Sequence, residues 1–127
     1  MNEYKFTSNG TDQSFLVNAN LFLAVLFTLA VFRDRWADDK LGSQSVLQRA
    51  FDWYKETFEG GQTGNRVQIA ARKLARQELD LRIQKILHYL AVMADDNDIN
   101  AILKTGVVKP KMRKKTRRAP RPAVTAN

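Results

Sequence analysis

The chain has 127 residues, 44% of them apolar, which suffices for one domain with a single hydrophobic core. It has no cysteine, which excludes disulfides, thiolate catalysis and cysteine-bound zinc and fits a cytoplasmic location. Residues 1–108 carry 13 Lys or Arg and 13 Asp or Glu, whereas residues 109–127 carry eight basic residues and no acid. The net charge of +8 therefore lies in the C-terminal segment, which we expect to be a docking appendage on a neutral body.

The first predicted element is a polar arm over residues 1–12, followed by a helix from Gln13 or Ser14 to about residue 38. This helix contains the apolar run of residues 21–32. The run has 12 residues, whereas a membrane span needs about 20, and Asn18 and Asn20 interrupt its upstream extension. The flanking residues also lack the charge and cleavage pattern of a signal peptide. We therefore expect a central helix that is buried in protein, and we expect no membrane partner.

Two more long helices come after a loop at residues 38–42. Ser43 or Ser45 is placed to cap the second helix, which ends at Gly60 and Gly61. Its apolar stripe consists of Val46, Leu47, Ala50, Phe51, Tyr54 and Phe58. The third helix is predicted over residues 65–94, with Arg82 and Lys85 exposed. One face of it should be buried, because apolar residues recur at steps of 4, 3, 4 and 3 at Leu79, Ile83, Ile86, Leu90 and Met93.

The acidic residues 95–98 break the third helix and can cap a short helix over residues 99–105, which Gly106 ends. All three prolines lie beyond it, at positions 110, 120 and 122, so we expect no strand in this segment. The sequence thus predicts an all-α, antiparallel up-and-down bundle of three long helices and one short helix over residues 13–108. Residues 109–127 form a basic tail that is disordered alone or ordered by a partner.

Residues 45–113 resemble a family of small, uncharacterised helical-bundle domains of bacteria. The matching blocks, in order, are GGQTGNR at 60–66, ARKLARQEL at 71–79, ILHYLA at 86–91 and DINAILKTGV at 98–107. The chain departs from the family at Val107, where the family usually has Phe, and the β-sandwich module that often comes next in the family is missing from this sequence. The resemblance implies a helical fold and carries over no activity and no binding residues.

Three motifs could carry chemistry, and each has a simpler structural interpretation. His88 is the sole histidine, and no second imidazole or thiol is present to join it in catalysis. A calcium loop starting at Asp96 would have Ala101 in place of its glycine and Val107 in place of its terminal acid. The segment 60–66 lacks the lysine and hydroxyl pair of a nucleotide-binding loop. We therefore predict a protein that is not an enzyme and needs no cofactor or metal.

The basic tail is the one segment with a positive argument for function. Its cations can neutralise phosphates without regard to sequence, and its lack of aromatic residues argues against stacking on bases. We predict binding of a polyanion, above all nucleic acid, through Lys109, Lys111, Arg113, Lys114, Lys115, Arg117, Arg118 and Arg121. The alternatives are a solubilising tail, a linker, or a dock for an acidic protein or lipid surface. The rival class is a structural protein that self-associates or docks on a protein partner through its apolar first helix.

Overall fold

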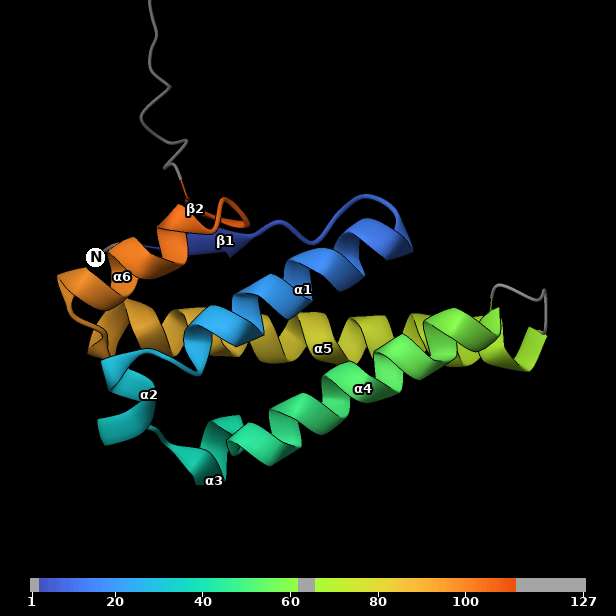
Figure 1. The fold of residues 1–127 in the computed structure, drawn as a ribbon, viewed down its shortest axis with the longest axis horizontal. Helices are drawn as coiled ribbons and strands as arrows, with labels where there is room; N and C mark the ends of the chain where they lie inside the picture. Colours follow the sequence, from blue (N-terminus) through green and yellow to red (C-terminus); the bar gives the residue numbers. More distant parts are fainter. Residues whose placement is uncertain (1–2, 62–65, 112–127) are drawn as a thin grey trace, which may run out of the picture.

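The computed structural model describes residues 3–61 and 66–111, and it is mostly helical, as expected (Figure 1). Helix α1 (Asp12–Leu26) is followed by two short helices, α2 (Ala30–Asp34) and α3 (Asp38–Leu41). The long helices α4 (Gln44–Gly61) and α5 (Arg66–Met93) come next, and then the short helix α6 (Asp96–Lys104). Strands β1 (Tyr4–Phe6) and β2 (Val108–Pro110) lie at the two ends of the described chain.

The core lies where α1, α4 and α5 meet. Helix α4 packs along α5, and α1 runs beside α4 and overlaps α5 in the view of Figure 1. As expected, α5 buries one face, which includes Leu79, Ile83, Ile86 and Leu90. Met93, however, is 38% exposed and not buried; it is the last residue of the helix. Lys85 is exposed as expected, whereas Arg82 is only partly so.

The expected single helix over residues 13–38 is wrong, because the chain bends after α1. Thr28 donates its hydroxyl to the Val25 carbonyl at 2.6 Å, so the side chain bonds to the backbone where the helix stops. The next helix is then capped from a distant part of the chain. The buried carboxylate of Asp98 accepts hydrogen bonds from the backbone N–H groups of Ala30 (3.2 Å) and Val31 (3.0 Å). A tertiary contact therefore sets the start of α2.

Helix α1 is also less enclosed than expected. Phe15, Phe22 and Leu26 are fully buried, but Val17 is 58% exposed and Leu21 is 39% exposed, so the helix buries only one side. No helix in residues 3–61 or 66–111 is both long and apolar enough to cross a membrane.

Strands β1 and β2 pair antiparallel, which contradicts the expectation of no strand after Gly106 and adds structure to the expected N-terminal arm. Phe6 and Val108 face each other in the register and are both buried against the core. Pro110 is tolerated because it stands at the end of a short edge strand, where no ladder hydrogen bond is needed from its nitrogen. We call this strand pair the β1–β2 ribbon. It brings residues that are about 100 positions apart in the sequence together beside α5 (Figure 1).

Replacing Asp98 with Ala should lower the free energy of unfolding by about 1–2 kcal/mol, because two backbone N–H groups at the start of α2 lose their acceptor. Urea denaturation followed by circular dichroism measures this. Asp96→Ala is the matched control, since Asp96 is exposed on the same turn of α6 and should change stability by less than about 0.5 kcal/mol. Equal losses in the two variants would show that Asp98 does not act as the cap.

Candidate functional site

The ribbon formed by β1 and β2 carries a concentration of positive charge. Lys5 lies directly opposite Lys109 in the strand register, and both side chains are exposed. Like charges in this position repel each other and destabilise a strand pair. No carboxylate forms a salt bridge with either lysine in the part of the chain that the structure describes. Lys111, just beyond β2, pairs with Glu3 at 3.7 Å, and both side chains remain more than half exposed.

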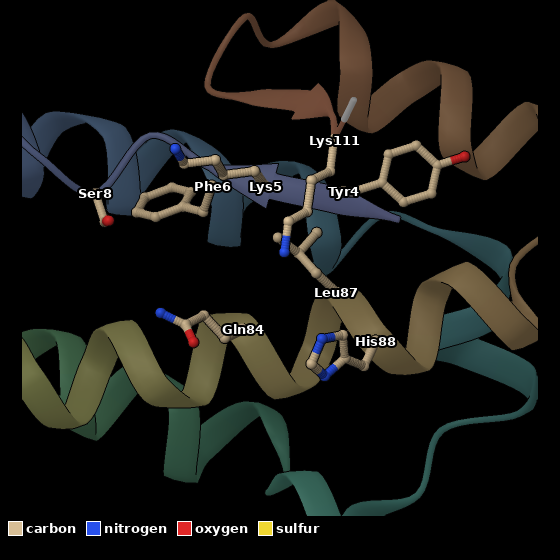
Figure 2. Close-up of a pocket in the computed structure, with 8 residues that line it drawn as sticks. All are labelled: Tyr4, Lys5, Phe6, Ser8, Gln84, Leu87, His88 and Lys111. Atoms are coloured by element: carbon tan, nitrogen blue, oxygen red, sulfur yellow. The ribbon is translucent and has the colours of Figure 1, made fainter. Parts of the chain in front are cut away.

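A pocket of about 300 Å³ lies between the ribbon and α5. Figure 2 shows Lys111 reaching down from the ribbon, while Gln84 and His88 project from α5 on the opposite wall. Its lining residues include three basic side chains and no acid; they are Tyr4, Lys5, Phe6, Ser8, Gln84, Leu87, His88 and Lys111. A second hollow, of about 370 Å³, borders β1 and is lined by Lys5 to Asn9 and by Lys109. Lys5 therefore borders both hollows, and the combination suits an anionic ligand.

Asp80 is the acid on α5 one turn before Gln84. Gln84 donates to Asp80 Oδ2 at 3.1 Å, while Oδ1 is buried with no hydrogen-bond partner. Burial raises the pKa of Asp80, and the hydrogen bond from Gln84 and the charge of Arg76 oppose this only in part. The side chain of Gln84 is thus held by a carboxylate that does not itself line the pocket.

The link between β1 and α1 is held against α5 by a polar junction centred on Asp12. Arg72 and Arg76 form salt bridges with its carboxylate at 3.0 and 2.8 Å. Arg76 also donates to the backbone carbonyls of Ser8 (2.7 Å) and Gly10 (3.1 Å). Tyr54 from α4 donates to Asp12 Oδ1 at 3.2 Å. The junction therefore fixes where β1 runs over α5, and with it the position of Lys5.

The structure describes the positions of only part of the predicted site, and the predicted binding role of these residues stays a prediction. Lys109 and Lys111 lie on or beside the ribbon and are exposed, whereas Arg113, Lys114, Lys115, Arg117, Arg118 and Arg121 lie outside the described residues. Sequence reasoning missed Lys5, Ser8 and Gln84. The alternation of Tyr4, Lys5 and Phe6 is a weak strand signal that could have suggested Lys5, but nothing local indicated its partner strand.

The other motifs have structural roles where they are described. Asp95 caps α6 by accepting from the backbone N–H of Asp98 at 2.9 Å, which confirms the capping interpretation, although α6 begins earlier than expected. His88 is exposed and lines the ribbon pocket. Most of the glycine-rich segment 60–66 lies outside the described residues. Within residues 3–61 and 66–111, no three acidic or histidine side chains gather in a way that could hold a metal ion.

Comparisons of the chain with protein-family models, curated proteins and solved structures found no match. The resemblance to bacterial helical-bundle domains therefore stays a prediction, and the function has to be inferred from the residues of this chain.

The Asp12 junction predicts a pH dependence of stability. Burial by itself would raise the pKa of Asp12, but hydrogen bonds from Arg76 and Tyr54 and the charge of Arg72 hold it below the usual 3.8. An acid whose pKa is lowered in the folded state stabilises the fold above its unfolded pKa, and this stabilisation is lost as the pH falls through the folded value. Asp12→Asn should therefore destabilise the protein at pH 7 and leave a shallower loss of stability below pH about 4.

Thermal unfolding of the wild type and Asp12→Asn between pH 2.5 and 7 measures this difference. Asp52→Asn is the control, because Asp52 is exposed on α4 and hydrogen-bonds only to Gln48 among the described contacts. A constant gap between wild type and Asp12→Asn across the whole pH range would contradict the prediction.

Proposed function

We propose that this chain is a non-enzymatic, cytoplasmic helical-bundle protein that binds a polyanion, above all nucleic acid, without sequence specificity. The binding surface consists of the ribbon lysines Lys5, Lys109 and Lys111 and the basic segment that continues from β2. One observation carries the proposal, namely the pairing of Lys5 opposite Lys109 at the point where the basic segment begins.

The charges on the ribbon favour binding of a polyanion over binding of a single small anion. Two exposed lysines that repel each other gain most when a charged ligand lies across both of them. The further cations of residues 111–121 extend the charge along the chain, so successive phosphates of one strand can be met in turn. The residues from Lys109 to Arg121 include no aromatic side chain, so binding rests on the phosphate backbone and not on the bases.

The ribbon also lowers the entropic cost of binding. Val108 is buried and the backbone N–H of Lys111 donates to the backbone carbonyl of Glu3 at 2.8 Å, so the first cations of the segment have fixed positions in the free protein. A chain that is already ordered loses less conformational freedom when a ligand arrives. The pocket beneath the ribbon offers Lys111 and His88 a place to hold one phosphate group while the rest of the strand runs along the basic segment.

Replacing both Lys5 and Lys109 with Gln tests the ribbon. Each lysine that meets a phosphate contributes about −0.9 to the slope of log affinity against log salt, so the double variant should flatten the slope by up to about 2. Between 50 and 200 mM salt, the affinity of the wild type should therefore fall roughly ten-fold more than that of the variant. Fluorescence anisotropy with labelled duplexes of two unrelated sequences measures both, and the effect should be equal on the two.

The matched control is Arg49→Gln with Lys55→Gln, which removes the same charge from α4, away from the ribbon (Figure 1). Arg117→Ala with Arg118→Ala tests the tail in the same assay and should flatten the slope by a similar amount. Binding that is insensitive to salt, or a control that loses as much as the ribbon variant, would refute the proposed surface.

A further inference from the structure

The outer face of α5, opposite its core face, carries an apolar stripe. Leu74 is 61% exposed, Leu81 is 58% exposed and Val92 is 66% exposed. Val67 stands one heptad before Leu74 and is also exposed. On a helix, residues seven apart lie nearly in line, so Val67, Leu74 and Leu81 form one seam along the side of α5. Single exposed leucines are ordinary, but an aligned series on the longest helix marks an interaction surface.

We infer that this seam is a self-association surface on which α5 of a second copy of the chain packs in parallel. The test of this proposal is the oligomeric state, which needs no polyanion. In heptad terms, Val67, Leu74 and Leu81 take the first core position, and Ala70, Gln77 and Gln84 take the second; Gln84 also lines the ribbon pocket, so the seam ends where that pocket begins. Parallel pairing places each leucine against the same leucine of the partner, in apolar layers that alternate with layers of Ala70, Gln77 and Gln84. Antiparallel pairing would instead place the seam residues against the second core positions of the partner, which include Gln77 and Gln84, so part of their apolar surface would face amides.

The charges that flank the seam favour the same arrangement. In a parallel pair, the residue before one core layer faces the residue five positions later on the partner helix. For this seam, Lys73 of one copy faces Glu78 of the other, and the two-fold symmetry provides the contact twice. Both side chains are exposed, and Glu78 is held in place by Arg82, which contacts its carboxylate at 3.4 Å. Opposite charges at these positions set the orientation more than they add affinity.

The surface beside the seam has room for a partner. Helices α3 and α5 enclose a hollow of about 240 Å³ next to Leu81, lined by Lys40, Leu41, Glu78, Leu81, Arg82 and Lys85. A side chain of the second copy can enter it as knobs enter holes between paired helices. The apolar first helix is the weaker candidate for self-association, because most of its large side chains already pack in or against the core and only Val17 and Leu21 are exposed among them.

Sedimentation equilibrium of the full chain, from micromolar to millimolar concentration, tests the proposal. The wild type should change from one chain to two as concentration rises. Leu74→Glu with Leu81→Glu should stay a single chain, with a dissociation constant raised at least about a hundred-fold, because two charges would be buried per copy. Val17→Glu is the matched control, since Val17 is as exposed as Leu81 but lies on α1, and this variant should dimerise like the wild type.

The orientation and register of the pair can be tested by disulfide cross-linking of an introduced cysteine, because the chain has no cysteine of its own. Leu74→Cys should form a covalent dimer under mild oxidation, since parallel pairing places residue 74 beside its own copy. Glu78→Lys should weaken the dimer by facing Lys73, and Lys73→Glu in the same chain should restore it. Circular dichroism confirms that each variant folds.

A wild type that stays a single chain at all concentrations would overturn the proposal. So would a dimer that Val17→Glu disrupts and the double leucine variant does not. A dimer in which Leu74→Cys fails to cross-link would refute the parallel arrangement. None of these outcomes decides whether the ribbon of one copy binds a polyanion, which is measured with labelled duplexes.

Discussion

The guanidinium of Arg76 donates to Asp12 and to two backbone carbonyls of the segment before α1. This segment has no regular structure of its own, so its path depends on these bonds and on Phe15, whose ring lies 4.7 Å from the guanidinium carbon. Phe15 in turn packs edge-on against Tyr54 of α4, which also donates to Asp12. Three helices and the approach to β1 therefore meet at one charged group. The position of the ribbon on α5, and with it the site, depends on that junction.

The ribbon orders the beginning of the basic tail, because Lys109 and Pro110 belong to β2. In residues 1–108 the positive and negative charges balance, so the eight cations of residues 109–127 dominate the field around the protein. Strand pairing adds Lys5 from the other end of the chain to this basic region. The apolar side chains of Phe6 and Val108 pack into the core and offset the repulsion between Lys5 and Lys109. A fold that tolerates such repulsion in its free state gains from any ligand that relieves it.

Local sequence patterns predicted the features that local interactions determine. The course of α5 agrees with its 3.6-residue periodicity, and the capping roles of Ser43 and Asp95 agree with their short polar side chains. The break after Leu26 could not be predicted, because the acceptor that starts α2 is Asp98, 67 positions away from Val31. The ribbon was missed for the same reason, since each strand has only three residues and its partner lies at the far end of the chain. The basic residues of the tail, which we propose as part of the site, were visible in the composition, whereas Lys5 and Gln84 join the candidate site only through tertiary packing.

Helix α5 packs one face against the core, and we propose that its outer face pairs with a second copy of the chain. Such pairing would affect how the two basic regions bind a polyanion. Parallel helices point the same way, so the two ribbons of a dimer lie toward the same end of the pair. One polyanion can then meet both basic segments, and the second contact forms at a high effective concentration once the first has formed. An antiparallel pair would set the ribbons at opposite ends and lose this gain on a short strand. In the proposed dimer, the orientation favoured by Lys73 and Glu78 would therefore decide whether the two cationic segments act as one surface.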